Sequence, residues 1–330
     1  MSEAGARILV TGTSGFIGQH LVQRLINRGC EVHGISRRNI GGQADGVRWW
    51  QGNLRDTDRT QQIVDAVQPE RIVHLASQVT GDRSLERVLP VLHDNLVSCV
   101  GLLTAAARNR CLRVVLAGSM EEPDLAEGLA VPGSPYAAAK WAGSAYGRMF
   151  HALYGLPVVV ARIFMVYGPG QQDIAKLVPY VITNFLRGEV PVLGSGKRAI
   201  DWVYVEDVAE GLERACFADG IGGLTLDMGS GRQDTIRDVV ESLAAIIQPP
   251  FDPVFGALAD RPLDREPVAD SGRTESILGW RATTPLRRGL EQTVRWYREH
   301  PQIYRWDAGA SGLATPSLGP VGKMRPRRGN

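Results

Sequence analysis

The sequence predicts an α/β protein: a doubly wound parallel sheet with a smaller lobe interleaved in its second half. Two observations carry this prediction. Strand-like runs such as residues 8–10 and 158–160 are continuously apolar, which is typical of strands buried on both faces of a parallel sheet. Helical patterns lie between most of these runs, and such alternation implies right-handed crossovers. Ligands of such sheets bind at the carboxyl ends of the strands.

The elements of the first half follow one another at regular intervals. Apolar runs predict strands over residues 7–11, 31–36, 47–51, 71–76, 113–118 and 157–163. Helical periodicity predicts helices over residues 16–28, 59–67, 92–109 and 135–154. After Gly168-Pro169-Gly170 the pattern loosens, and short strands and Pro/Gly-rich links alternate with helices over residues 176–187, 208–218, 236–247 and 286–300.

These patterns divide the chain of 330 residues into three parts. We expect a sheet domain over residues 1–168, to which strands and helices near 200–230 return. The smaller, interleaved lobe is expected over residues 169–306. Residues 307–330 are rich in Gly, Pro and Ser and end in basic residues, a composition that predicts a disordered tail.

Charge and composition exclude several classes of protein. A net charge of +2 gives no basic stripe of the kind that nucleic-acid binding needs. No uninterrupted apolar run approaches the roughly 20 residues that span a bilayer, and residues 1–7 lack the regions of a signal peptide. The four cysteines are widely spaced, so we expect reduced thiols and a cytoplasmic protein. No Cys/His cluster has metal-ligand spacing, so no metal site is expected.

A glycine-rich loop joins the first strand to the first helix. Gly12 permits a tight turn, Gly15 lets the backbone approach a diphosphate, and Gly18 allows close packing of the helix on the strand. The helix N-terminus adds free N–H groups and a positive dipole end. The order strand, loop, helix therefore predicts a dinucleotide site, which we expect to contact Gly12, Ser14, Gly15, Phe16, Ile17, Gly18, Asn53, Leu54, Leu75, Ala76, Ser77 and Ile163.

The second strand indicates which dinucleotide binds. NAD sites usually end this strand with an acidic residue that accepts hydrogen bonds from the adenosine ribose. Here it ends in Ser36, Arg37 and Arg38, which suit a ribose phosphate through charge-assisted hydrogen bonds. The sequence therefore favours NADP(H) over NAD(H).

Three residues suit proton transfer beside a nicotinamide. Tyr136 and Lys140 are four apart at the start of a helix, so they share a face. A nearby ammonium is expected to lower the pKa of the phenol. Ser119 follows the fifth strand at its carboxyl end and can hydrogen-bond a substrate carbonyl. We predict that these residues form the catalytic group of an oxidoreductase.

These motifs resemble the extended short-chain dehydrogenase/reductase family, particularly its nucleotide-sugar epimerases, dehydratases and reductases. The resemblance spans residues 6–300 and includes, in order, residues 11–18, 74–76, Asn95, and residues 134–140, 161–164, 167–171, 201–208 and 278–280. It implies a Rossmann-like nucleotide domain, a C-terminal substrate lobe, bound NAD(P), and commonly a homodimer formed through helices near 92–109 and 135–154.

The segment after the fifth strand indicates the kind of reaction. Family dehydratases commonly carry Thr-Asp-Glu there, with the acidic pair handling proton removal and water loss. This chain has Ser119, Met120 and Glu121, and Met120 cannot transfer a proton, although Glu121 remains a candidate base. The pattern looks like reductases of nucleotide-linked 4-keto-6-deoxyhexoses. Because an epimerase must retain one NAD, the NADP-like pattern favours NADPH-dependent reduction as the leading hypothesis.

Two departures from the family concern the substrate. Met165 stands where an asparagine is usual, and Ile200 where an arginine usually grips the diphosphate. Losing a buried donor and a cation weakens diphosphate binding, for which Lys197, Arg198 or Arg261 could compensate. The expected substrate-binding residues are Gln78, Asn95, Met120, Met165, Lys176, Lys197 and Arg261.

Three alternatives stay open at this stage. The enzyme could be a nucleotide-sugar 4-epimerase or 4,6-dehydratase with a tightly held cofactor. It could be a ketoreductase whose substrate carries no nucleotide. It could also be a silent dinucleotide sensor, although such proteins tend to lose Tyr136 or Lys140, and both are present.

Overall fold

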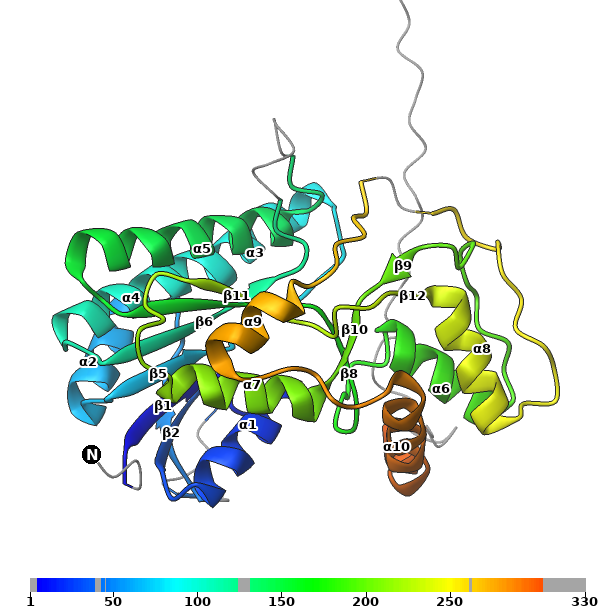
Figure 1. Cartoon of the computed structure of the whole chain (residues 1–330), viewed down its shortest axis with the longest axis horizontal. Coiled ribbons are helices and arrows are strands. Elements are labelled where there is room, and N and C mark those ends of the chain that lie inside the picture. Colours follow the sequence, from blue (N-terminus) through cyan, green and yellow to red (C-terminus); the bar gives the residue numbers. More distant parts are fainter. Residues whose placement is uncertain (1–4, 39–42, 45, 124–130, 261–262, 305–330) are drawn as a thin grey trace, which may run out of the picture.

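The computed structural model describes residues 5–38, 43–44, 46–123, 131–260 and 263–304. Within them the chain forms one large α/β unit and a smaller lobe beside it (Figure 1). The predicted tail, residues 307–330, and the substrate candidate Arg261 lie outside the described residues.

The large unit is built on one eight-stranded sheet in the order β11-β7-β6-β5-β1-β2-β4-β3. Seven strands are parallel, and the short β3 pairs antiparallel with β4 at the edge. The predicted fold class, a Rossmann-like doubly wound sheet, is thereby confirmed. The strands are β1 (Arg7–Thr11), β2 (Glu31–Ser36), β3 (Gln43–Ala44), β4 (Val47–Gln51), β5 (Arg71–His74), β6 (Arg113–Ser119), β7 (Val158–Ile163) and β11 (Thr225–Met228).

Helices cover both faces of this sheet (Figure 1). One layer holds α2 (Thr57–Val67), α4 (Ser98–Arg108) and α5 (Pro135–Tyr154), and the other holds α1 (Phe16–Asn27), α7 (Val205–Phe217) and α9 (Ser271–Leu278). Two apolar cores result, one on each side of the sheet, because successive side chains of a strand point to opposite faces. Val159 belongs to one core, for example, and Val158 and Leu116 to the other.

The predicted helix 92–109 is longer and less regular than expected. It is preceded by η1 (Leu85–Arg87) and α3 (Val88–Val91), and η2 (Leu92–Val97) is a π-helix that continues into α4. By length and apolar composition alone, Leu85–Arg108 would qualify as a membrane-crossing helix. Charged and polar residues, among them Asp94, interrupt its apolar run. Here α4 packs against α2 and α5 of the same chain.

The smaller lobe contains three helices packed together and two short sheets (Figure 1). Its helices are α6 (Leu177–Arg187), α8 (Ile236–Ile247) and α10 (Leu286–Glu299), followed by η4 (Pro301–Ile303). β8 (Met165–Tyr167) pairs parallel with β10 (Trp202–Tyr204), and β9 (Ala199–Ile200) pairs antiparallel with β12 (Asp234–Thr235). β11 pairs with β7 and α7 packs on α1, so the chain returns to the large sheet between parts of the smaller lobe.

Buried Asp201 ties this lobe to the end of the large sheet. Its carboxylate accepts hydrogen bonds from the backbone N–H groups of Ser230, Gly231 and Ala269 at 2.7, 3.0 and 3.0 Å. A fully buried carboxylate is costly unless its oxygens are bonded in this way. The segment that follows β11 and the segment that precedes α9 therefore meet at the Asp201 carboxylate, directly before β10.

Candidate active site

The glycine loop closes tightly between β1, β5 and α1. Gly12 has φ +72°, and a Cβ there would lie 2.7 Å from the backbone nitrogen of Ala76. A Cβ on Gly18 would lie 2.1 Å from the Gly12 carbonyl oxygen, so the helix starts in direct contact with the loop. Gly15 is the N-cap of α1 and has no side-chain cap, which leaves N–H groups of the first turn to a ligand. This cradle fits the diphosphate of a dinucleotide.

Thr11 fastens the glycine loop to the end of β5. Its hydroxyl accepts from the Ala76 backbone N–H at 3.2 Å and shares a hydrogen bond of 2.7 Å with Nδ1 of His74. Burial, and secondarily the charge of Lys140, lowers the pKa of His74 to about 3. The imidazole is consequently neutral, and its bond to Thr11 lies next to the predicted cofactor contacts Leu75 and Ala76, which are both half-buried.

The predicted adenosine end of the site lies at the carboxyl ends of β2 and β4. Ser36 ends β2, its hydroxyl accepts from the Arg38 backbone N–H at 3.1 Å, and both Arg37 and Arg38 are exposed. The Asn53 side chain accepts from the Arg55 backbone N–H at 3.1 Å, so this amide shapes the turn before α2. The adjacent Leu54 packs against the apolar core.

Tyr136, Ser119 and Lys140 come together as predicted, at the junction of β6 and α5. Ser134 is the N-cap of α5, and its hydroxyl accepts from the Ala137 backbone N–H at 3.0 Å. This cap places Tyr136 in the first turn, where the side chain is 7% exposed and its phenol interacts with Ser119. The Ser119 hydroxyl also accepts from the Glu121 backbone N–H at 3.2 Å, which fixes its orientation.

The expected effect of Lys140 on the phenol is absent from this structure. The ammonium of Lys140 donates to the Ala117 carbonyl at 2.8 Å and lies 5.9 Å from the centroid of the Tyr136 ring. Burial raises the pKa of Tyr136 well above its usual range, Ser119 opposes this shift, and the charges of Glu121 and Glu122 add to it. Burial also lowers the pKa of Lys140. The prediction of a lowered tyrosine pKa was therefore wrong, because the phenol is desolvated and the Lys140 ammonium bonds the Ala117 carbonyl of β6.

The two residues after Ser119 differ in their surroundings. Met120 is buried, and its backbone N–H donates to the Ile163 carbonyl at 3.0 Å. Glu121 accepts from the Ser134 hydroxyl at 3.4 Å. Burial raises the pKa of the Glu121 carboxyl, while the charges of Arg198 and Lys176 lower it. Glu121 is thus a partly desolvated carboxyl near cations of the smaller lobe, the setting that a proton-transferring carboxyl needs.

The predicted substrate residues do not all face one space. Buried Asn95 accepts from the Gln78 backbone N–H at 2.7 Å and donates to the Gln78 carbonyl at 3.1 Å, so its amide holds the loop after β5. The Gln78 Oε1 atom is buried and has no hydrogen-bond partner in the described part of the chain. Lys176 donates to the Val79 carbonyl at 3.3 Å and bridges the lobes. Met165 is half-buried at the start of β8, and Lys197 is exposed.

Asp264 joins the two lobes through a pair of arginines. One carboxylate oxygen lies 2.6 Å from Arg83, which precedes η1, and the other lies 3.2 Å from Arg198, which precedes β9. Arg198 also donates to the Arg265 carbonyl at 2.7 Å. Arg198, a candidate to compensate for Ile200, is therefore engaged in holding this segment, and Ile200 is buried.

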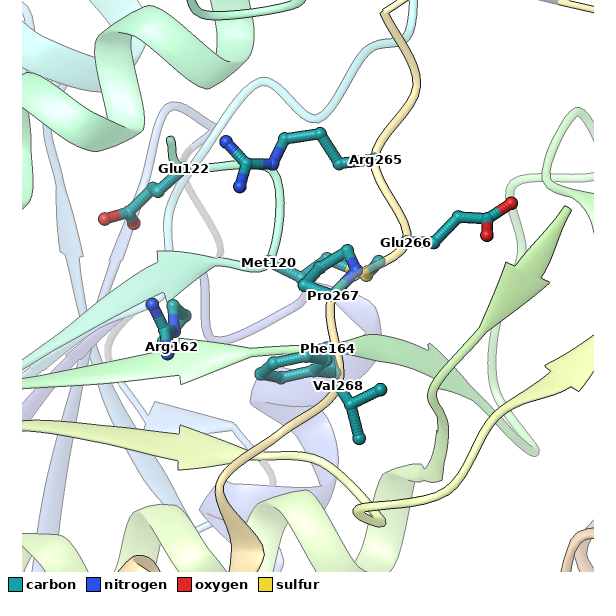
Figure 2. Close-up of a pocket in the computed structure, with 8 residues that line it drawn as sticks. All are labelled: Met120, Glu122, Arg162, Phe164, Arg265, Glu266, Pro267 and Val268. Carbon is teal, nitrogen blue, oxygen red and sulfur yellow. The ribbon is translucent and has the colours of Figure 1, made fainter. Parts of the chain in front are cut away.

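A cavity of about 360 Å³ lies at the turn that follows β6, and the sequence did not reveal it (Figure 2). Met120, Glu122, Arg162 and Phe164 line it from the sheet, and residues 265–268 line it from the segment that follows Asp264. Arg162 is paired with Asp227 through two hydrogen bonds of 2.7 and 2.9 Å. Local sequence carries no signal for this cavity, because residues 265–268 are more than 100 positions from β7.

Comparisons with known proteins agree with this geometry. The model of the NAD dependent epimerase/dehydratase family matches residues 8–220. The dTDP-glucose 4,6-dehydratase of Xanthomonas campestris is 29% identical over 88% of this chain and 92% of its own length. The UDP-glucose 4-epimerase of Mycolicibacterium smegmatis is 30% identical over 90% of this chain and 100% of its own.

Solved structures are similar over most of the chain. The UDP-glucose 4-epimerase of Thermotoga maritima with UDP-glucose has a TM-score of 0.81 at 26% identity, covering 89% of this chain and 99% of its own. The UDP-glucose 4-epimerase of Thermus thermophilus in complex with NAD has a TM-score of 0.79 at 29% identity, covering 88% and 99%.

Proposed function

Because this chain belongs to the NAD-dependent epimerase/dehydratase family, we propose that it modifies the hexose of a sugar nucleotide by transient oxidation with a retained nicotinamide cofactor. Its relatives are dehydratases and epimerases of nucleotide-linked glucose. This moves the NADPH-dependent reduction expected from the sequence to second place. Of the two redox-neutral reactions, 4-epimerisation is the better supported by the residues around Ser119.

The observation that carries the proposal is the buried pair of Ser119 and Tyr136 at the carboxyl end of β6. The nicotinamide, when bound, supplies the hydride acceptor and donor, and its oxidised form adds positive charge beside the phenol. Tyr136 takes the proton of the reacting hydroxyl and returns it, while Ser119 aligns the oxygen. Lys140 would hold the ribose of the cofactor, and burial keeps water out. Positioned acid–base groups of this kind contribute on the order of 10²–10⁴-fold in rate.

Epimerisation is favoured over dehydration because of Met120. Elimination of water needs both proton removal from carbon and protonation of the departing hydroxyl. Buried Met120 can do neither, which leaves Glu121 as the one titratable side chain among the two residues after Ser119. Inversion at a hydroxyl-bearing carbon needs no acid or base beyond Tyr136.

NADPH-dependent ketone reduction remains the second candidate, supported by the end of β2. Exposed Arg37 and Arg38 beside Ser36 suit a ribose phosphate, and NADPH would exchange at each turnover. Ile200 and Met165 also leave open a ketone substrate without a nucleotide. We further propose, from the family resemblance, a cytoplasmic homodimer formed through α4 and α5.

The test begins with the purified protein and its bound nucleotide. We expect stoichiometric, non-exchanging cofactor and interconversion of the C4 epimers of UDP-glucose or dTDP-glucose, followed by nuclear magnetic resonance. Tyr136→Phe should lose on the order of 10²–10⁴-fold in turnover and keep its cofactor. Tyr146→Phe, a half-exposed tyrosine of the same helix, is the matched control.

Each alternative has its own signature in the same preparation. A cofactor-free protein that consumes NADPH only with a 4-keto sugar nucleotide would establish the reductase instead. Release of a 4-keto-6-deoxy product from dTDP-glucose would establish the dehydratase. Near-normal turnover by Tyr136→Phe would remove Tyr136 from its assigned role in all three reactions.

A further inference from the structure

Glu122 is a buried carboxylate that none of the roles above uses. It is 7% exposed, and its Oε1 atom accepts from the backbone N–H of Ser119 at 2.8 Å. The Ser144 hydroxyl of α5 also interacts with this side chain and lowers the pKa of its carboxyl. Burying a carboxylate is costly unless its oxygens are bonded and its charge is balanced, so an apolar side chain would fill this place with less penalty.

The bonds of Glu122 connect the catalytic turn to the catalytic helix. Ser144 lies one helical turn beyond Lys140 and two beyond Tyr136, on the same face of α5. Lys140 in turn bonds the Ala117 carbonyl, two residues before Ser119 on β6. The end of β6 is thus fastened to α5 twice, once through the ammonium of Lys140 and once through the carboxylate of Glu122.

The fit around the carboxylate is close. A Cβ added to Gly118 would lie 2.8 Å from Oε1 of Glu122, so the strand has no side chain at this point and the carboxylate occupies the space. The Ser119 carbonyl also accepts from the Glu122 backbone N–H at 3.0 Å. Main chain and side chain of Glu122 therefore both hold Ser119.

Two cations face Glu122, from different elements. Lys140 approaches from α5 and Arg162 from β7. Arg162 is held in place by its paired bonds to Asp227. In Figure 2 the Glu122 carboxylate and the Arg162 guanidinium lie on the same side of the cavity, and Arg265 approaches from the opposite segment. Burial raises the pKa of Glu122, whereas the Ser119 N–H, Ser144 and the two cations lower it.

We propose that Glu122 is a positioning residue of this site, which holds the Ser119 turn against α5. The inference rests on the proposed roles of Ser119, Tyr136 and Lys140. Glu122 acts through these groups and touches no reacting atom.

The sign of its electrostatic effect follows from the neighbours of each group. The charge of Glu122 raises the pKa of Tyr136, as does that of Glu121. It also raises the pKa of Lys140, together with Cys99 of α4 and against the effect of burial. Removing the charge should therefore lower the pKa of both the phenol and the ammonium.

Three variants separate geometry from charge. Glu122→Gln keeps an oxygen acceptor for the Ser119 N–H and removes the charge. Glu122→Ala removes both. Glu266→Gln is the matched control, because Glu266 lines the same cavity from the other segment and in Figure 2 points away from Glu122. Turnover against pH, cofactor affinity against pH by nicotinamide fluorescence, and thermal unfolding are measured for each.

We expect Glu122→Gln to keep most of its turnover at neutral pH and to shift both pH profiles to lower pH. Glu122→Ala should lose about tenfold in kcat with little change in KM, the rate equivalent of one buried hydrogen bond. Glu266→Gln should match the parent protein.

Equal loss in both Glu122 variants without a shift of either profile, or parental behaviour of Glu122→Ala, would overturn the inference. The affinity profile distinguishes this failure from failure of the proposed function. A shifted affinity profile in a protein that turns over no sugar nucleotide would support Glu122 while refuting the proposed reaction. Turnover of a sugar nucleotide, with neither pH profile shifted in the Glu122 variants, would support the proposed reaction and refute the role of Glu122.

Discussion

Replacing Gly18 by alanine tests how the glycine loop is built. The new Cβ would lie 2.1 Å from the carbonyl oxygen of Gly12 and 3.0 Å from that of Thr13. Both are backbone atoms, so no side chain can rotate away to make room. Either the start of α1 or the loop itself must move, and both form the cradle for the diphosphate.

Magnitudes decide where the effect of Gly18→Ala will appear. Overpacking costs about 1–3 kcal/mol, and alanine recovers roughly 1 kcal/mol through its higher helix propensity. Net destabilisation is therefore about 0–2 kcal/mol. Misplaced N–H donors should each cost about 1.5–3 kcal/mol in binding a charged diphosphate, which is roughly 10- to 100-fold in Kd. Cofactor affinity should fall more than stability does.

The assay titrates NADH and NADPH by nicotinamide fluorescence and compares urea unfolding of the same proteins. Gly143→Ala is the matched control, because Gly143 is also a buried helix glycine, but its Cβ would meet only Cys99 Sγ at 3.7 Å, an ordinary contact. We expect this control to bind cofactor normally. If Gly18→Ala binds as tightly as the parent protein, the loop is not held by this contact and the packing argument is refuted.

Three further predictions concern charge and buried polar groups. Burial lowers the pKa of His20, but its bonds to Glu206 and the Pro169 carbonyl raise it more, to a net value above 6.5. Protonated His20 therefore stabilises the fold below pH 6.5, and this stabilisation is lost as pH rises through the raised pKa. The thermal midpoint of His20→Gln should consequently fall less than that of the parent protein between pH 6 and 9. Arg37→Ala should weaken NADPH about tenfold and spare NADH, measured by titration; equal effects on both would refute the phosphate contact. Asp201→Asn should lose on the order of 3 kcal/mol in urea unfolding, since three backbone donors converge on this carboxylate; parental stability would contradict this.

The strands of the first half of the sheet can be predicted from the local sequence pattern, whereas the return of the chain to the sheet at β11 cannot. β1, β2 and β4 have the predicted bounds, and the centre of β1 is continuously apolar because it is buried on both faces of the sheet. β11 is four residues long and includes Asp227, so its pattern resembles a loop. Its place is fixed by pairing with β7 and by the Arg162 bond to Asp227, both of which join residues 65 positions apart. Helix α9 was not predicted either, because it is only eight residues long and its place depends on packing against β11 and α7.

The residues proposed for catalysis are recognisable in the sequence because their spacing is local, but their electrostatics are set by tertiary structure. Helical periodicity places Tyr136 and Lys140 on one face. It does not tell that Lys140 reaches back to Ala117 or that burial, not the ammonium, dominates the pKa of Tyr136. Sequence likewise treats Asn95 as a substrate ligand, whereas its amide bonds the loop at Gln78.

Glu121 and Glu122 are adjacent in the turn after β6, but they have different surroundings. Both are buried enough to have a raised carboxyl pKa, so composition and burial alone do not distinguish them. Glu121 is surrounded by groups from both lobes, with Ser134 on one side and Arg198 and Lys176 on the other. Glu122 is bonded within the sheet domain, to Ser119 and Ser144. The two glutamates therefore differ in their partners: the bond from the Ser119 N–H ties Glu122 to the end of β6, whereas Glu121 is surrounded by cations of the smaller lobe.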